Sequence, residues 1–291
     1  QDSCQVLFEA TISWLFASFL YFSNGLWVKI GYNSLKSLTS QGTEMQLFAL
    51  MLGLSIILWL LSLRLKDASI ADIMWGLWFV VQALFHYQEA PNPRTMLLLI
   101  LTALWGFRLS FYLFLRNRNK AEDRRYQAMR HHHGSHFWWR SFYTVFLFQM
   151  LLAWIIGAPQ RMVGTDSTLS ILNLIGIVCF IIGFSFECCA DFQLRQFLQM
   201  NRSSQVLRTG VWKYSRHPNY FGDALLWWGF ALIAIDTASD WWFFLSPVLM
   251  TFLLLRVSGV SLLEQDIRER RPEYTDYIEK TSAFIPWFPK K

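Results

Sequence analysis

Long apolar runs separated by short polar segments dominate this chain of 291 residues. A membrane-spanning helix needs about 20 mainly apolar residues, and eight runs approach that length. No run shows the alternation of a half-buried strand. The pattern therefore predicts an all-α fold, a polytopic membrane helical bundle with seven or eight transmembrane helices. The predicted spans are 6–27, 45–63, 70–87, 95–115, 137–157, 169–189, 220–235 and 241–263, of which the seventh is short and interrupted by glycine.

Composition and charge support the same class of protein. Charged residues make up 16% of the chain, whereas soluble domains average about 25%. Of the 26 lysines and arginines, 20 fall in four segments that alternate with the spans and so share one face: 64–69, 116–140, 195–218 and 264–291. The positive-inside rule makes that face cytosolic. The net charge of +6 thus reflects topology, and we expect no nucleic-acid partner.

The organisation is simple. We expect residues 1–44 to form an extra helix and loop, and residues 45–291 to form one membrane domain. No glycine-rich dinucleotide motif follows a strand pattern, so a Rossmann domain is excluded. We therefore expect an integral membrane protein, located in the endoplasmic reticulum membrane if the host is eukaryotic and in the inner membrane if it is bacterial. The run His131–His133 predicts a solvated loop and no metal site, because consecutive histidines cannot all face one ion.

Ionisable groups inside a spanning helix are costly and point to function. Most of those found here lie near the predicted cytosolic helix ends, although they come from different spans. They predict a polar cavity open to the cytosol. The residues are Glu9, Asp72, Arg108, Glu187, Asp191, Asp223, Arg256 and Glu264.

Structural alternatives stay open for these positions. Asp191 and Arg195 have the i, i+4 spacing of an ion pair on one helix. Asp72 has the position of an N-terminal helix cap. The basic loop 207–217 precedes Pro218, which can open a helix whose first N–H groups favour anions. The same loop could instead rest on anionic lipid.

Several motifs together resemble the C-terminal domain of steroid 5-alpha-reductases and their less characterised relatives. The wider superfamily includes sterol reductases and isoprenylcysteine carboxyl methyltransferases. The resemblance covers about residues 66–289. Its motifs are Asp-Ile-Met-Trp at 72–75, Trp-Gly-Phe-Arg-Leu at 105–109, Glu-Asp-Arg-Arg-Tyr at 122–126, Ala-Asp-Phe-Gln-Leu-Arg at 190–195, Arg-His-Pro-Asn-Tyr-Phe-Gly-Asp at 216–223, Ser-Gly-Val-Ser-Leu-Leu-Glu at 258–264 and Thr-Ser-Ala-Phe-Ile-Pro-Trp-Phe-Pro at 281–289.

The resemblance implies that the chain binds NADPH in a cytosol-facing cavity. Cations would hold the phosphates, and carboxylates and amides would hold the ribose hydroxyls and the carboxamide. The implied cofactor residues are Tyr112, Asn117, Arg118, Asp191, Arg195, Tyr214, Asn219 and Asp223, with Arg108, Arg216, His217, Tyr220 and Glu264 as neighbours.

The implied reaction is the reduction of an activated C=C bond in a steroid, sterol or other lipid. The chain departs from the steroid enzymes, which use a Gln-Glu pair on an early helix and a Tyr on the next. No such pair is present, and Trp105 stands where the Tyr would be. Asp72 is the remaining candidate for the acid, so the catalytic prediction is Asp72 with Trp105. The departure argues against a steroid substrate more than against another apolar lipid.

Two other functions remain open. A methyltransferase binding S-adenosylmethionine would share the Arg-His-Pro loop, although Asn219 and Asp223 resemble the reductases more closely. A non-catalytic lipid-binding protein would explain the missing Gln-Glu and Tyr residues, but not why the whole cofactor-type loop is kept.

Overall fold

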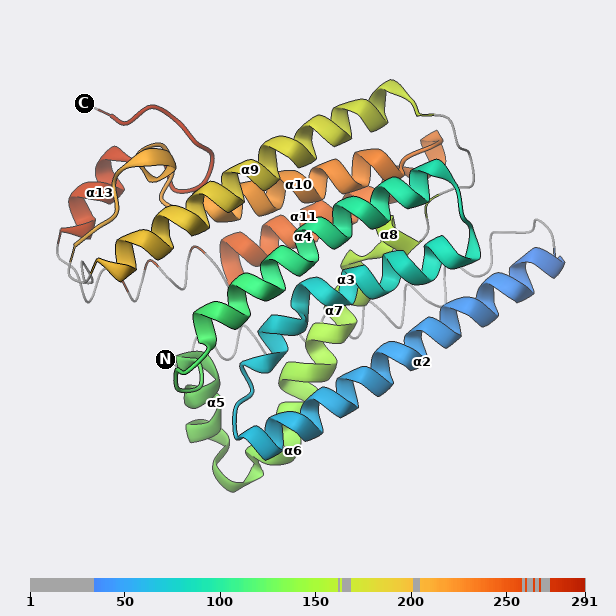
Figure 1. Ribbon diagram of the computed structural model, residues 1–291, viewed down its shortest axis with the longest axis horizontal. Coiled ribbons are helices and arrows are strands. Elements are labelled where there is room, and N and C mark those ends of the chain that lie inside the picture. Colours follow the sequence, from blue (N-terminus) through green and yellow to red (C-terminus); the bar gives the residue numbers. More distant parts are fainter. Residues whose placement is uncertain are drawn as a thin grey trace. The chain divides into compact units, whose positions relative to one another are not determined.

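The computed structural model describes residues 34–161, 163, 169–200, 205–257, 260, 264, 267 and 273–290, with side chains from residue 42 onward. Every regular element in these ranges is helical (Figure 1), which confirms the all-α prediction. Short 3-10 and π-helical turns are written η. The elements are α2 (Ser34–Leu65), α3 (Ile70–Glu89), α4 (Pro93–Asn117), α5 (Arg124–His133), η1 (Gly134–His136), α6 (Phe137–Ser141), η2 (Phe142–Leu147), α7 (Phe148–Ile156), α8 (Ala158–Arg161), α9 (Ile171–Gln199), η3 (Gly210–Lys213), α10 (Pro218–Ala234), η4 (Ala238–Phe244), α11 (Leu245–Phe252), η5 (Leu253–Val257) and α13 (Tyr274–Lys280).

Six helical stretches within the described ranges are long and apolar enough to cross a membrane. They match six of the predicted spans. The predicted span 6–27 lies outside the described residues. Helix α2 runs through position 44, the predicted domain boundary, and that division stays a prediction. The six stretches are Gly42–Leu65, Ile70–Glu89, Pro93–Asn117, Arg124–Ile156, Ile171–Gln199 and Ser239–Val257.

The chain divides into two compact units. Unit 1 comprises Gln1–Trp78 and Leu109–Trp154, and unit 2 comprises Phe79–Arg108 and Ile155–Lys291. The divisions fall inside α3, α4 and α7, so three helices contribute to both units.

The core of unit 1 forms where the start of α3 packs against α5, α6 and η2. Asp123 starts α5 by accepting the backbone N–H of Arg125 at 3.0 Å, as an N-cap does. Glu122 accepts the backbone N–H of Ala68 at 2.8 Å and the guanidinium of Arg130 at 2.8 and 2.9 Å. The acidic pair at 122–123 thus fixes the start of α5 against the turn before α3.

The prediction of a loop at His131–His133 is wrong. These residues form the last turn of α5, where His131 and His132 are exposed. The N-cap at Asp123 stabilises the start of α5. Basic side chains in the last turn of α5 interact favourably with the helix dipole, which favours helix through these positions. Gly134, with φ of 53°, then ends the helix.

Helices α9 and α10 run side by side in unit 2 (Figure 1), and glycines set their distance. A Cβ on Gly183 would lie 2.5 Å from the carbonyl oxygen of Gly222, and the reverse distance is also 2.5 Å. One heptad away, Gly176 and Gly229 face each other with corresponding distances of 2.7 and 2.6 Å. Any side chain at these positions would force the antiparallel backbones apart.

Helix α10, in the predicted span 220–235, has 17 residues and is buried on most sides within unit 2. An apolar helix that is covered all round belongs to a protein core and need not match a lipid layer. Pro218 occupies its first turn, as predicted, because proline lacks the N–H that would be unpaired there.

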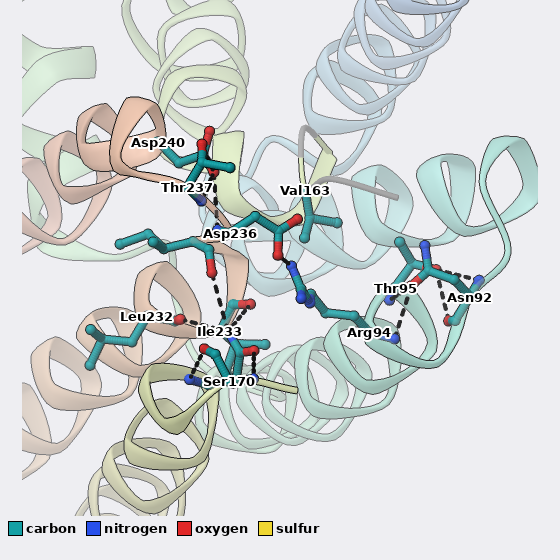
Figure 2. Close-up of polar contacts among 12 residues, drawn as sticks. Asn92, Arg94, Thr95, Val163, Ser170, Leu232, Ile233, Asp236, Thr237 and Asp240 are labelled. Atoms are coloured by element: carbon teal, nitrogen blue, oxygen red, sulfur yellow. Dashed lines mark hydrogen bonds and ion pairs between the residues drawn. The ribbon is translucent and has the colours of Figure 1, made fainter. Parts of the chain in front are cut away.

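Polar side chains close the far end of this helix (Figure 2). Asn173 donates from Nδ2 to the carbonyl oxygens of Leu232, Ile233 and Ile235 at 3.0–3.3 Å. These carbonyls have no helical partner of their own. Beside them, Arg94 at the start of α4 forms a buried ion pair with Asp236, which follows α10.

Candidate functional site

A buried polar cluster joins α4, α9 and α10 in unit 2. Arg108 donates from Nη1 to Asp191 Oδ2 at 2.7 Å and pairs through Nη2 with Glu187. The indole N–H of Trp105 donates to Glu187 Oε2 at 3.1 Å. Glu187 and Asp191 are 4% and 5% exposed, so both carboxylates are held inside the protein. The predicted polar residues of two spans therefore meet.

Helix α10 adds two acceptors to this cluster. Asn219 donates from Nδ2 to Asp191 Oδ1 at 3.4 Å. Asp223 is 8% exposed. Within the described part of the chain, Asn219 Oδ1 and Asp223 Oδ1 are buried oxygens that no donor reaches with full hydrogen-bond geometry, although the Trp227 side chain lies close to Asp223. Buried acceptors are normally satisfied, so these two are available to a ligand that donates N–H or O–H.

The glycine contacts explain why these residues converge. A Cβ on Gly222 would lie 2.6 Å from the backbone nitrogen of Glu187, so the two helices touch at that level. Glu187 and Asp191 follow Gly183 on one face of α9 at successive i+4 steps, and Asn219 and Asp223 flank Gly222 on α10. We call Trp105, Arg108, Glu187, Asp191, Asn219 and Asp223 the Arg108 cluster.

Carboxyl groups outnumber cations in the Arg108 cluster. One guanidinium faces three carboxyl groups, and it pairs with two of them. The cluster therefore presents spare acceptors. Carboxylate and amide oxygens suit hydroxyl and carboxamide donors, and they do not suit phosphate.

A second group of polar residues lies where α10 begins. Arg216 binds Glu264 with two bonds, Nε to Oε1 at 2.7 Å and Nη2 to Oε2 at 3.1 Å. His217 Nε2 lies 3.1 Å from Glu264 Oε1. We call Arg216, His217 and Glu264 the Arg216 clamp. Burial alone would raise the pKa of Glu264, but hydrogen bonds from His217 and Arg216 outweigh it and lower the pKa to about 2.

The remaining donor of Arg216 is also engaged. Its Nη1 donates to the carbonyl oxygens of Ile278 and Thr281 at 3.0 and 2.6 Å. In this arrangement the guanidinium, predicted as a neighbour of the cofactor, joins the start of α10 to the C-terminal segment. Its role toward a phosphate stays a prediction.

The loop before α10 is anchored to α9. Trp212 donates its indole N–H to the carbonyl oxygen of Ala190 at 3.2 Å, and Val211 N–H donates to Gln193 Oε1 at 3.1 Å. Gly210 has φ of 63°, and a Cβ there would lie 2.3 Å from Gln193 Oε1. Glycine is therefore required at this turn.

Asp72 lies in a different polar cluster, inside unit 1. Its Oδ1 accepts the hydroxyl of Tyr126 at 2.6 Å, and its Oδ2 accepts Arg125 Nη2 at 2.7 Å. Gln149 Nε2 donates to Tyr126 Oη at 3.1 Å and lies 3.4 Å from Asp72 Oδ1. Asp72 thus pairs with side chains of α5 and α7. We call Asp72, Arg125, Tyr126 and Gln149 the Asp72 cluster.

The other predicted residues are distributed over both units. Tyr112, Asn117 and Arg118 belong to unit 1. In unit 2, the Arg195 side chain is exposed, whereas Asp191 pairs with Arg108. Tyr214 packs edge-on against Phe288 with centroids 6.0 Å apart, and Tyr220 stacks on His217 at 5.6 Å.

Some members of these clusters were not predicted as site residues. Glu187 was recognised only as a costly charge in a span. Tyr126 and Arg125 belong to a recognised motif, but the sequence does not show that they face Asp72. Gln149 lies in an apolar run with no motif, and only the folded structure reveals it.

Comparisons with known proteins place the chain in a family. Residues 58–281 match the model of the family described as "Protein of unknown function (DUF1295)". The chain is 25% identical to the "Uncharacterized protein C594.04c" of Schizosaccharomyces pombe (strain 972 / ATCC 24843), over 79% of this chain and 76% of that protein. No solved structure matches the chain.

Proposed function

Because the chain belongs to the DUF1295 family of unknown function, a steroid 5-alpha-reductase-like family, we propose that it is an integral membrane reductase that uses NADPH. The proposed substrate is a lipid with an activated C=C bond, such as an enone, and the proposed cofactor site faces the cytosol. The observation that carries the proposal is the pair of open acceptors, Asn219 Oδ1 and Asp223 Oδ1, in the Arg108 cluster.

The residues of the Arg108 cluster fit the sugar and amide parts of a nicotinamide nucleotide. Asp191, Asn219 and Asp223 would provide oxygens that accept hydrogen bonds from the ribose hydroxyls and from the carboxamide N–H groups of the cofactor. In a buried site these donors need protein acceptors, because water does not reach them. Arg195 and Lys213 are exposed cations of unit 2 that could hold phosphates. When bound, NADPH supplies the hydride that reduces the β carbon of the enone.

The chain's own residues would supply position and a proton. Arg108 holds Glu187 and Asp191 in fixed orientations, and Trp105 further fixes Glu187. As our proposed proton source, Asp72 would first have to take up a proton, because in this structure both of its oxygens accept hydrogen bonds, from the Tyr126 hydroxyl at 2.6 Å and from Arg125 at 2.7 Å. A donor polarising the substrate carbonyl would favour hydride addition.

Cofactor binding by the detergent-purified protein tests this function. A ligand that binds only the folded state raises the apparent melting temperature by mass action. We expect stabilisation by NADPH, a smaller effect of NADH, and none by S-adenosylmethionine. The Asn219→Ala and Asp223→Asn variants should lose the NADPH shift while they keep their melting temperature without ligand.

Asp276→Asn is the matched control for these variants. Asp276 is a half-exposed carboxylate on α13 that pairs with Arg208 and Lys280, away from the Arg108 cluster. This variant should keep the NADPH shift. If NADPH stabilises neither wild type nor control, the proposed function is wrong.

One observation also favours a methyltransferase. Three carboxyl groups around one guanidinium would suit the sulfonium cation of S-adenosylmethionine as well as hydroxyl donors. Stabilisation by S-adenosylmethionine in place of NADPH would establish that alternative.

A further inference from the structure

The C-terminal segment 281–290 has no helix or strand, yet it is held firmly against unit 2. Three backbone hydrogen bonds of 2.9 Å fix it: Arg216 N–H to Ser282, Trp287 N–H to Tyr214, and Lys290 N–H to Lys280. Holding a chain segment in one course costs conformational entropy. The fixed course of the segment therefore needs an explanation.

Side chains of the loop before α10 add further restraints. Ser215 donates from Oγ to the carbonyl oxygen of Phe284 at 2.8 Å. The Arg216 clamp binds the carbonyl oxygen of Thr281 at 2.6 Å. The segment thus lies at the end of the α9–α10 pair where α10 begins (Figure 1).

The fixed segment turns its largest apolar side chains outward. Ile285, Trp287 and Phe288 are 64%, 71% and 76% exposed. A segment held only to complete the core would bury such residues. Single exposed apolar side chains are ordinary, but three within four positions on a fixed segment indicate a binding surface.

A hollow of about 370 Å³ lies beside these side chains. Its positive side chains are Arg216, Lys280 and Lys290, and its negative side chain is Glu279. Arg216 is neutralised by Glu264, and Lys280 pairs with Asp276 at an exposed site. The lining residues, which we call the tail hollow, are Arg216, Ile278, Glu279, Lys280, Thr281, Ser282, Ala283, Trp287, Phe288 and Lys290.

We propose that the tail hollow binds the headgroup of an anionic phospholipid, while Ile285, Trp287 and Phe288 enter the adjacent membrane interface. Tryptophan prefers this interface, because its ring is apolar and its N–H is polar. Lysines beside it attract the anionic lipids of the cytosolic leaflet. The described residues 205–218, which lead into α10, include Arg208, Lys213 and Arg216 and no acidic residue, which favours an anionic lipid over a second protein.

Fluorescence quenching on the full chain in nanodiscs tests the proposal. The native cysteines are replaced by serine, and an Ile285→Cys variant carries an environment-sensitive fluorophore. A spin label near the headgroup end of the acyl chain is placed on phosphatidylglycerol or on phosphatidylcholine, in otherwise identical nanodiscs. Each lysine near a membrane surface favours anionic lipid by roughly fivefold, so we expect at least about twofold stronger quenching by labelled phosphatidylglycerol.

The Lys280→Gln/Lys290→Gln double variant should remove this preference. Arg64→Gln/Lys120→Gln removes the same charge from exposed positions of unit 1 and should leave it intact. A Trp241→Cys label, on a 71% exposed residue of η4, should be quenched equally by both lipids.

Three results would overturn the proposal. They are equal quenching at position 285 by both lipids, no quenching by either, and a preference that survives in the Lys280→Gln/Lys290→Gln variant. Glycerol 3-phosphate added to the protein in detergent separates a free phosphate from a lipid. If it shifts the fluorescence of the label as phosphatidylglycerol does, the hollow is a phosphate site and the lipid proposal is wrong.

Discussion

At the scale of single residues, Glu264 shows how a carboxylate is kept ionised at the end of a membrane helix. Its pKa is lowered from 4.5 to about 2 because His217 and Arg216 donate to it. A carboxyl whose pKa is lower in the folded state stabilises the fold above its unfolded pKa. That contribution should be complete above about pH 4.5 and should disappear as the pH falls toward 2.

Glu264→Gln measures this contribution. The melting temperature of the variant should lie below that of wild type near neutral pH, and the difference should shrink between pH 4.5 and 2. Melting curves across this range provide the test. A difference that is independent of pH would mean that Glu264 acts through packing alone.

The Asp72 cluster allows stability and catalysis to be separated. Tyr126→Phe removes a hydroxyl that donates to Asp72 and accepts from Gln149, and should cost about 1–3 kcal/mol of stability. If Asp72 supplies the proton, Asp72→Asn should lower enone reduction by about 10²-fold or more, the usual effect of losing a general acid. NADPH binding to Asp72→Asn, measured by thermal shift, should be unchanged.

Asp123→Asn is the control in the same region, because the Asp123 side chain caps α5 and binds Arg125, whereas Tyr126 meets Asp123 only through its backbone N–H. Its enone reduction should remain near that of wild type. Equal loss of reduction in both variants would assign Asp72 a structural role.

The sequence indicated which polar residues inside the spans are important, but it did not indicate which residues they contact. Arg108 and Asp191 stand out because charge in an apolar run is costly. The pairing of Arg108 with α9 depends on a packing register between distant helices, which no local pattern contains. For Asp72, an N-terminal cap and a catalytic acid fit the sequence equally well, and its contact with Tyr126 appears only in the fold.

At the scale of elements, the α9–α10 contact depends on its glycines. Gly183→Ala would place a methyl group 2.5 Å from a backbone oxygen that cannot move without shifting α10. Overpacking of this kind costs about 1–3 kcal/mol. Since Glu187 follows one turn later, we also expect weaker NADPH binding.

Gly53→Ala is the matched control for this variant. Gly53 lies within α2, and a Cβ there meets nothing within 4 Å. Alanine is favoured over glycine in a helix by about 1 kcal/mol, so this variant should be as stable as wild type or more so. If the two variants have the same melting temperature, close packing does not hold α9 to α10.

The Arg94–Asp236 ion pair ties the start of α4 to the end of α10 (Figure 2). Removing one partner of a buried pair leaves an uncompensated charge and costs about 3–5 kcal/mol. Arg94→Met and Asp236→Leu should each lower the melting temperature strongly. The double variant should be more stable than the sum of the two losses predicts, which a double-mutant cycle measures. Additive losses would show that the pair is not coupled.

The apolar runs predicted where the long helices lie, but they did not predict whether lipid or protein covers each helix. Six of the predicted spans are helices long and apolar enough to cross a membrane, because about 20 apolar residues in succession fit few other structures. The short α10 carries the same apolar signal, but it is covered by protein on most sides. The composition of a segment does not distinguish burial by protein from burial by lipid.

At the scale of the whole molecule, contacts within unit 2 constrain the membrane topology. Arg216 precedes α10, and its partner Glu264 follows the stretch Ser239–Val257. Residues in contact lie on the same side of a membrane, so the chain between them must cross an even number of times. If Ser239–Val257 crosses, as its length allows, α10 must cross with it.

The length of α10 is compatible with this crossing. Its 17 residues span about 25 Å, slightly less than the roughly 30 Å of a hydrocarbon layer. Neighbouring helices cover most of it, so it need not meet lipid along its whole length. The Lys213→Cys and Ser239→Cys variants, at exposed positions before and after α10, should therefore lie on opposite faces of the membrane.

Labelling with an impermeant maleimide, in a cysteine-free background and in sealed vesicles with the cytosolic face outward, tests this topology. The positive-inside rule places position 213 on the cytosolic face, because it lies in a basic segment. Lys213→Cys should react in intact vesicles, and Ser239→Cys only after detergent is added. Reaction of both in intact vesicles would mean that α10 does not cross. Glu264 could then reach Arg216 only if Ser239–Val257 also failed to cross, and the proposed cytosolic cofactor site would lose its topological basis.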